Sequence, residues 1–247
     1  MVSKTVAHRL KLATIARYLG IPWIMYNRSA LLRIALEGFT AGEVLDVGCA
    51  DGTYLSMLSS YVSASLCVGI DLSSNELYLA KRNINTPKCN IILADAQALP
   101  FRASAFDLIF SKDLLHHLND PIRALCEFKR ALKYKGIIVI LETRRENPLM
   151  KLYIKYGHDH FSLQKLINIL DRAGLKGCTI KQASAYPHHF LFPPSKLFEI
   201  FWDLIILVLL LLSHVSIVRY SLFRLLQRSI SPSYNVVIWR KNKTDID

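Results

Sequence analysis

The sequence predicts a doubly wound α/β domain, in which helices cover both faces of a mainly parallel sheet. Short apolar runs of strand length alternate with helix-like segments, and a glycine-containing turn follows the first run. Polar residues stand at the ends of successive runs, where open α/β sheets bind their ligands. With 247 residues, 52% of them apolar and 20% charged, the chain can bury a core of this kind.

The first predicted strand, Glu43 to Val47, runs directly into the turn Gly48-Cys-Ala-Asp-Gly52. Two glycines four residues apart leave the backbone without Cβ atoms, so a bulky cofactor can lie against the peptide groups. The helix predicted from about Thr53 would point its positive end at the same ligand. The spacing differs from the Gly-x-Gly-x-x-Gly fingerprint of dinucleotide-binding proteins, and Asp46 favours a cationic ligand over a pyrophosphate.

Four further apolar runs are predicted strands that end in polar residues. They are Ser65 to Ile70 before Asp71, Asn90 to Ala94 before Asp95, Phe106 to Phe110 before Ser111-Lys-Asp-Leu-Leu-His-His-Leu118, and Gly136 to Leu141 before Glu142. Asp71 stands 25 residues after Asp46, near the spacing expected of a ribose-binding acid. Its carboxylate can accept from both ribose hydroxyls of a nucleoside, and that of Asp95 from an exocyclic adenine amine.

Residues from about Glu43 to Glu142 resemble the class I S-adenosylmethionine-dependent methyltransferases, especially the group with small-molecule members. The motifs that carry the resemblance are Asp-Val-Gly-Cys-Ala-Asp-Gly, Ala-Asp-Ala-Gln-Ala-Leu-Pro-Phe, Phe-Asp-Leu-Ile-Phe-Ser and Leu-His-His-Leu, in that order. The resemblance implies a Rossmann-like, seven-stranded sheet whose last strand is antiparallel, and S-adenosylmethionine as the cofactor.

The same resemblance assigns cofactor contacts to seven residues. It implies that the methionine part is lined by Asp46, Gly48 and Gly52, the ribose held by Asp71, the adenine by Asp95 and Ala96, and the amino end by Ser111. For each acid taken singly, the alternative is a helix cap or an ordinary loop residue.

An unusually apolar stretch, Leu197 to Leu226, precedes the last predicted strand, Tyr234 to Arg240. It approaches the roughly 20 apolar residues that a membrane-spanning helix needs. A single crossing, however, would separate the last strand from the sheet. We therefore expect an apolar helical insert that returns, as a re-entrant hairpin or as helices in the membrane interface. A buried helix or a dimer interface is the alternative.

The predicted organisation has four parts. They are a helical lid at 1–40, the cofactor-binding core at 41–185, the membrane-associating insert at 186–230, and the closing strand and tail at 231–247. Within the first part, Lys4 to Leu19 is basic with an apolar face, and forms a lid, a membrane-surface helix or an outer packing helix. Tyr26-Asn-Arg28 is expected to precede a helix from Ala30 to Glu37, with Arg28 placed to contact the cofactor carboxylate.

Histidines supply the candidate catalytic residues. His158 and His160 lie between the fifth and sixth strands, in the segment that shapes the acceptor pocket of this fold, and His116 and His117 follow the fourth strand. A neutral imidazole accepts a proton at working pH, so His158, His160 or His116 is a candidate general base. Alternatively, His158 and His160 hydrogen-bond only the loop, or bind a metal with further ligands; of His116 and His117, one faces the pocket and the other packs.

The net charge of +12 calls for an anionic partner. Nucleic acid is disfavoured, because neither a base-amine methylation motif nor an aromatic-rich basic tract is present, and an anionic membrane surface is favoured. Five cysteines occur singly, so no metal site and no disulfide framework are predicted. Basic residues interrupt the N-terminal stretch, so no secretory signal is expected. We expect a cytoplasmic, membrane-associated protein.

Together these observations predict methyl transfer from S-adenosylmethionine to a lipid-linked or apolar small-molecule acceptor at a membrane surface. Such a transfer is an in-line displacement, in which placing the acceptor close and aligned does most of the work. Two alternatives remain. One is a soluble methyltransferase for a small metabolite, whose apolar insert covers the pocket or forms a dimer. The other is a non-enzymatic, cofactor-binding membrane adaptor.

Overall fold

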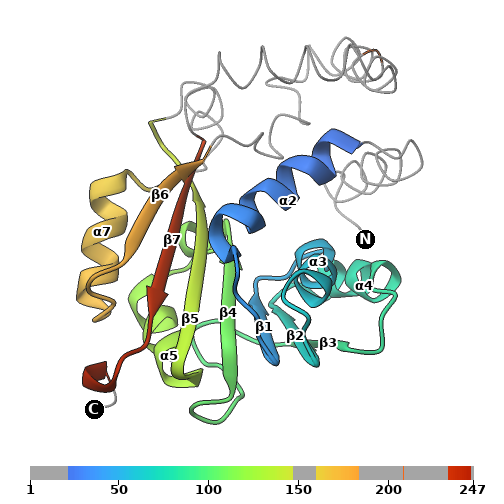
Figure 1. The fold of residues 1–247 in the computed structure, drawn as a ribbon, viewed down its shortest axis with the longest axis horizontal. Coiled ribbons are helices and arrows are strands. Elements are labelled where there is room, and N and C mark those ends of the chain that lie inside the picture. The colour runs from blue at the N-terminus through green and yellow to red at the C-terminus, as the bar shows by residue number, and fades with distance from the viewer. Residues whose placement is uncertain (1–21, 147–159, 184–207, 209–232, 246–247) are drawn as a thin grey trace.

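The computed structural model describes residues 22–146, 160–183, 208 and 233–245, and Figure 1 shows the arrangement of their elements. Within them, seven strands form one mixed sheet in the order β3-β2-β1-β4-β5-β7-β6. The strands are β1 (Glu43–Val47), β2 (Leu66–Asp71), β3 (Cys89–Leu93), β4 (Phe106–Lys112), β5 (Leu132–Thr143), β6 (Thr179–Ala183) and β7 (Tyr234–Arg240). The seven-stranded, doubly wound sheet is therefore confirmed. The segment 4–19, His158 and, apart from Val208, the apolar stretch 197–226 lie outside the described residues.

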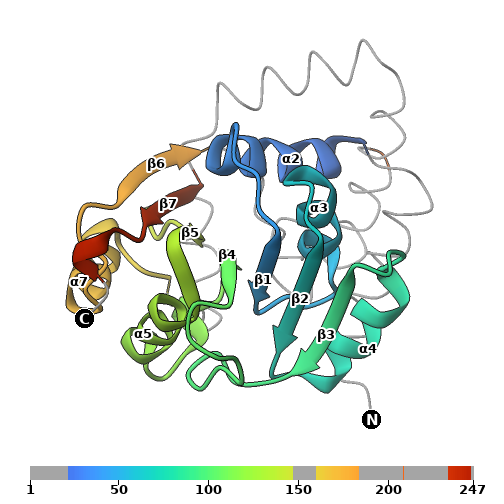
Figure 2. The ribbon, with the colours of Figure 1, turned by 60° about the horizontal axis from the view of Figure 1, so that its bottom comes forward.

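The order of the strands creates a switch point between β1 and β4. All pairs from β3 across to β5 are parallel, whereas β7 is antiparallel to both β5 and β6. The chain leaves β1 towards β2 and β3 on one side, and returns to β4 on the other (Figure 2). At such a switch point the loops diverge, and open α/β sheets bind ligands outside the carboxyl ends of the strands there.

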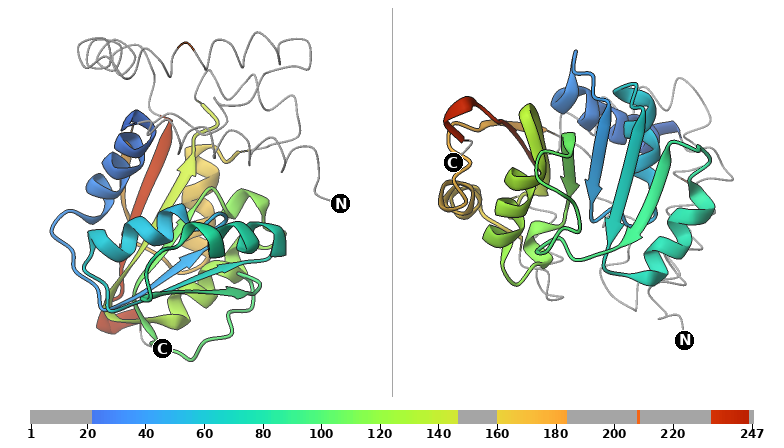
Figure 3. Two further views of the ribbon diagram at one scale, coloured as in Figure 1. Left: turned by 90° about the vertical axis from the view of Figure 1, so that its right-hand side faces the viewer. Right: turned by 90° about the horizontal axis from the view of Figure 1, so that it is seen from below.

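Helices cover both faces of the sheet. One core packs α2 (Pro22–Leu36) and α3 (Thr53–Tyr61) against one face, and the other packs α5 (Pro121–Ala131) and α7 (Leu163–Arg172) against the opposite face (Figure 3). The helix α4 (Ser74–Asn83) contacts β2 and β3. Alternate residues of β4 divide between the two cores, Phe110 facing α3 and Ile109 facing α5, as the two-residue period of a strand requires.

The helix α2 begins earlier than the sequence predicts. It starts at Pro22, so Arg28 lies inside the helix and does not precede it, and the prediction of a helix from Ala30 is wrong at its start. Proline suits the first position of a helix, because its missing N–H has no helical partner there and its fixed φ is already helical. Arg28 is thereby held on a rigid element next to α3.

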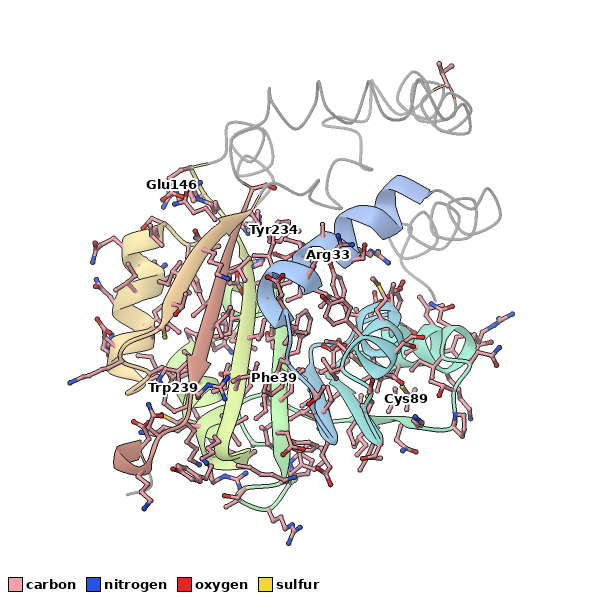
Figure 4. The ribbon with its side chains drawn as sticks, in the orientation of Figure 1. Arg33, Phe39, Cys89, Glu146, Tyr234 and Trp239 are labelled. Carbon is pink, nitrogen blue, oxygen red and sulfur yellow. The ribbon has the colours of Figure 1, made fainter. Side chains whose placement is uncertain are left out.

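The fifth strand is also longer than predicted. It begins at Leu132, which pairs with Phe106 before the register shifts at a β-bulge, and continues to Thr143. The closing strand β7 runs beside it, with Tyr234 and Trp239 at opposite ends (Figure 4). Tyr234 thus lies near the carboxyl ends of the parallel strands. None of the helices in the described ranges is long and apolar enough to cross a membrane.

Candidate active site

The glycine turn after β1 lies at the switch point and depends on its glycines. Gly48 and Gly52 both have a φ of 74°, in the left-handed region that side chains disfavour. A Cβ atom at Gly52 would lie 2.9 Å from Cδ1 of Ile84, and one at Gly48 would lie 3.0 Å from Cδ1 of Leu114. The glycines therefore serve the tight turn and its packing against neighbouring side chains.

Asp71 ties this turn to the end of β2. Its Oδ2 accepts from the backbone N–H of Ala50 at 2.9 Å, and its Oδ1 accepts from the backbone N–H of Ser73 at 2.9 Å. Each carboxylate oxygen retains a second lone pair, so both remain able to accept from a ribose hydroxyl. The residue that the resemblance assigns to the ribose is thus also the one that orients the glycine turn.

Replacing Asp71 with alanine is expected to weaken S-adenosylmethionine binding by about 1–3 kcal/mol, the scale of hydrogen bonds to a charged group. The variant loses acceptors for the ligand and for Ala50 and Ser73 together. Isothermal titration calorimetry measures the change, and Asp71→Asn, which keeps one carbonyl acceptor, should lose less. If the alanine variant bound S-adenosylmethionine as tightly as the parent protein does, Asp71 would not be part of the cofactor site.

Asp46 is a buried acid beside the turn. Only 1% of its surface is exposed, and its Oδ2 has no hydrogen-bond partner among the described residues. Burial, followed by the nearby carboxylates of Asp71 and Asp51, raises the pKa of Asp46 to about 8, while Lys112 acts in the opposite direction. A buried acceptor left open in this way fits a ligand that brings a positive charge or an N–H donor.

The other predicted cofactor residues lie in two different parts of the structure, after β3 and on the α5 face of the sheet. Asp95 follows β3, where its Oδ1 accepts from the backbone N–H of Gln97 at 2.8 Å, and the adjoining Ala96 is buried. Ser111 is fully buried and its Oγ has no partner among the described residues, but it pairs with Val47 on the α5 face of the sheet. Asp46, by contrast, pairs with Phe110 on the α3 face.

Two cations and two aromatic rings gather on the face that holds Asp46. Cζ of Arg28 lies 5.8 Å from the ring centroid of Tyr54, and Nζ of Lys112 lies 5.7 Å from the same centroid and 5.0 Å from that of Tyr234. The Tyr54 hydroxyl is buried without a partner among the described residues. The zwitterionic end of a methionine fits this chemistry, because cations suit its carboxylate and Asp46 suits its amine.

Asp113 holds Lys112 at the end of β4. The two side chains form an ion pair, and Asp113 also accepts from Oγ1 of Thr143 at 2.6 Å and from the hydroxyl of Tyr234 at 3.1 Å. Three strands, β4, β5 and β7, are thereby joined at their ends. The sequence did not predict this set of residues, because they come together from distant parts of the chain.

His116 forms a buried pair with Glu142 on the opposite face. Its Nδ1 lies 2.7 Å from Oε2 of Glu142, and each side chain is 1% exposed. Oε1 of Glu142 accepts from the backbone N–H groups of Leu114 and Leu115, at 3.1 and 2.8 Å. The carboxylate therefore accepts a hydrogen bond from Nδ1–H, and this tautomer leaves Nε2 as the nitrogen that can accept a proton. Burial lowers the pKa of His116, but the hydrogen bond and charge of Glu142 outweigh it and raise the pKa.

The structure brings His160 to the same place. The ring centroids of His160 and His116 are 4.4 Å apart, and those of His117 and His116 are 4.1 Å apart. His160 is buried, whereas His117 is exposed. Asn235 pairs with Glu142 across β5 and β7, and both of its amide atoms are buried without partners among the described residues. Within the described ranges no group of three or more His, Cys, Asp or Glu side chains is placed to hold a metal ion.

The comparisons with known proteins agree with this geometry. Residues 45–140 match the family model described as a methyltransferase domain. A tRNA U34 carboxymethyltransferase of Campylobacter jejuni is 27% identical over 170 residues, which cover 64% of this chain and 58% of that protein. A phthiotriol/phenolphthiotriol dimycocerosates methyltransferase of Mycobacterium ulcerans is 29% identical over 125 residues, covering 51% of this chain and 45% of that protein.

The chain thus spans about half the length of the curated relatives it matches. Among solved structures, an S-adenosylmethionine-dependent methyltransferase of Thermotoga maritima, a possible histamine N-methyltransferase, has a TM-score of 0.60 at 16% identity. That match covers 96% of this chain and 99% of the other, and at this identity it shows the fold alone. The glycine turn, the strand order and the family match agree: residues 45–140 form a class I S-adenosylmethionine-dependent methyltransferase domain, for which S-adenosylmethionine is the methyl donor.

Proposed function

We propose that the protein transfers a methyl group from S-adenosylmethionine to a lipid-linked or apolar small-molecule acceptor at a membrane surface. The observation that carries the methyl transfer is the glycine turn at the switch point, with Asp46 and Asp71 beside it, inside the matched domain. The acceptor class rests on the apolar stretch 197–226 and on the net charge of +12.

In this proposal the cofactor lies across the carboxyl ends of β1, β2 and β3. Asp71 holds the ribose, Asp95 and Ala96 hold the adenine, and the turn from Gly48 to Gly52 lies along the methionine part. Asp46 takes the amino end, because its buried oxygen is an open acceptor, and Arg28 with Lys112 on the same face takes the carboxylate, because both are cations. When bound, the cofactor supplies a methyl group on a positively charged sulfur.

The acceptor is proposed to lie beyond the ends of β4 and β5. His116 is the general base, since Glu142 binds its Nδ1–H and leaves Nε2 to take a proton from an acceptor hydroxyl or amine. Glu142 acts through His116 as a positioning residue. His160, whose ring contacts that of His116, is the second candidate on this side, and Ser111 belongs to the same face of the sheet.

The relatives are named for different reactions, carboxymethyl transfer to U34 of tRNA in one and methyl transfer to phthiotriol/phenolphthiotriol dimycocerosates in the other, so their names do not select an acceptor. A direct test incubates the protein with labelled S-adenosylmethionine and either a membrane lipid extract or a pool of water-soluble metabolites. Label in the lipid fraction supports the proposal. Label only in the soluble pool favours the small-metabolite enzyme, and cofactor binding without transfer to either favours the adaptor.

Association with a membrane surface is a separate prediction. The protein should float with liposomes that contain anionic lipid and float less at high salt, because each nearby Lys or Arg adds about 1 kcal/mol that salt screens. Flotation on a density gradient measures this, with neutral liposomes as the control. A protein that ignores both kinds of liposome, and needs no detergent, would favour a buried insert or a dimer.

A further inference from the structure

Buried polar atoms without a hydrogen-bond partner occur on both faces of the sheet. In the described part of the chain, Asp46 and Tyr54 contribute such atoms on the α3 face, where the cofactor is proposed to lie. On the α5 face, Ser111 contributes its Oγ, His116 its Nε2 and Asn235 both atoms of its amide. Folded proteins leave few buried polar groups unpaired, so the second set indicates a ligand on the α5 face as well.

Asn235 lies near the start of β7 and is fully buried. In the antiparallel pairing of β5 with β7 it stands directly opposite Glu142, which places their Cβ atoms about 4.5–5.5 Å apart. Ile140 and Val237, two positions away along each strand, belong to the α5 core, so the two-residue period puts Glu142 and Asn235 on that face. Asn235 is therefore next to the carboxylate that holds His116.

The polar side chains beside Asn235 are already engaged elsewhere. Glu142 accepts from His116 with one oxygen and from two backbone N–H groups with the other. On the other side, Gln182 of β6 stands opposite Asn235, and its Oε1 accepts from Nη1 of Arg144 at 3.2 Å. A leucine of similar size at position 235 would leave no polar atom unpaired, so the stability of the fold does not account for the amide.

We infer that Asn235 is a specificity-determining residue of the acceptor site, whose amide binds a second, neutral polar group of the acceptor beside the atom that becomes methylated. The inference rests on the proposed function, because it takes His116 as the base at that atom. Since Asn235 and His116 both border Glu142, the second group lies within a few bonds of the methylated atom.

The chemistry of the amide defines the group that it can bind. Nδ2 of Asn235 donates and Oδ1 accepts, so the matching group brings one acceptor and one donor, as a carboxamide or a pair of hydroxyls does. An anionic group is disfavoured, because it would bring no donor to Oδ1 and would meet the carboxylate of Glu142 on the neighbouring strand.

The first test uses the parent protein with labelled S-adenosylmethionine, the membrane lipid extract and the pool of water-soluble metabolites. Tandem mass spectrometry of the labelled product should find a carboxamide or a pair of hydroxyls within a few bonds of the new methyl group. A product without such a group there, or with only an anionic one, would overturn the inference and leave methyl transfer intact. Absence of label in both pools would instead overturn the proposed function.

The variant Asn235→Leu tests the residue itself. With the acceptor identified in the first test, kcat/KM should fall by about 10–100-fold, because the polar group of the acceptor is left unpaired. The affinity for S-adenosylmethionine, measured by calorimetry, should stay unchanged, since the cofactor is proposed to lie on the other face. Denaturation in urea should show a variant at least as stable as the parent, because leucine removes the unpaired amide.

Gln182→Leu is the matched control, since it makes the corresponding change at the exposed position that faces Asn235 on β6. It should keep the turnover of the parent protein. Unchanged turnover in Asn235→Leu, or an equal loss in Gln182→Leu, would show that the Asn235 amide does not bind the acceptor. Should Asn235→Leu fail to fold, the structure of the product made by the parent protein decides the inference.

Discussion

Replacing His116 with glutamine is expected to lower turnover by about 10²–10⁴-fold, the usual loss when a general base is removed, while the affinity for S-adenosylmethionine stays nearly unchanged. Cofactor affinity should be unaffected because the pair His116–Glu142 lies on the opposite face of the sheet from Asp46. Steady-state rates with the acceptor found in the labelled extract measure turnover, and calorimetry measures cofactor affinity.

The matched control is His117→Gln, which changes the same residue type at an exposed neighbouring position. It should retain most of the activity. His160→Ala and His158→Ala belong in the same assay, because either could be the base instead. If one of these two variants lost as much turnover while His116→Gln stayed active, the residue replaced in that variant would be the general base.

The pH profile separates a catalytic role from a structural one. The base must be neutral to accept a proton, so kcat/KM should rise with pH through the pKa of His116, which the negative charge of Glu142 raises. Glu142→Gln removes that charge while keeping a hydrogen-bond acceptor, and should therefore shift the rising limb to lower pH. An unshifted limb in Glu142→Gln would show that the titrating group is not this pair.

Replacing Phe110 with alanine is expected to lower the free energy of unfolding by about 3–5 kcal/mol, because it leaves a cavity in a fully buried part of the sheet. Phe110 is 0% exposed, stacks on Tyr54 with ring centroids 5.4 Å apart, and pairs with Asp46 on β1. Denaturation in urea, followed by circular dichroism, measures the loss.

Phe128→Ala is the matched control, since Phe128 is equally buried but belongs to α5, in the core on the opposite face of the sheet. Both variants should lose similar stability, whereas only Phe110→Ala should also weaken cofactor binding, through the displaced Tyr54. Equal cofactor affinity in the two variants would show that Tyr54 and its neighbouring cations do not contribute to the cofactor site.

The sequence by itself determined the elements that depend on local patterns. The glycine turn, the strand from Glu43 to Val47 and the closing strand from Tyr234 to Arg240 follow from apolar runs bounded by turn residues, and each appears where it was predicted. The acids at the strand ends could also be recognised, because each lies in or within two residues of the last part of an apolar run. The start of α2 was misplaced, although Pro22 was a usable signal for it.

Only the tertiary structure decided which of these residues meet. Glu142 pairs with His116 across 26 residues of chain, and Arg28 reaches Tyr54 only because α2 packs beside α3. The sequence also could not show that Ser111 and Asp46 lie on opposite faces, since that depends on the register of β1 against β4. Burial decided which of the acids at the strand ends has a shifted pKa. An acid at a strand end has its ordinary pKa until neighbouring strands and helices exclude water from it, and that exclusion, with two more carboxylates nearby, sets Asp46 apart.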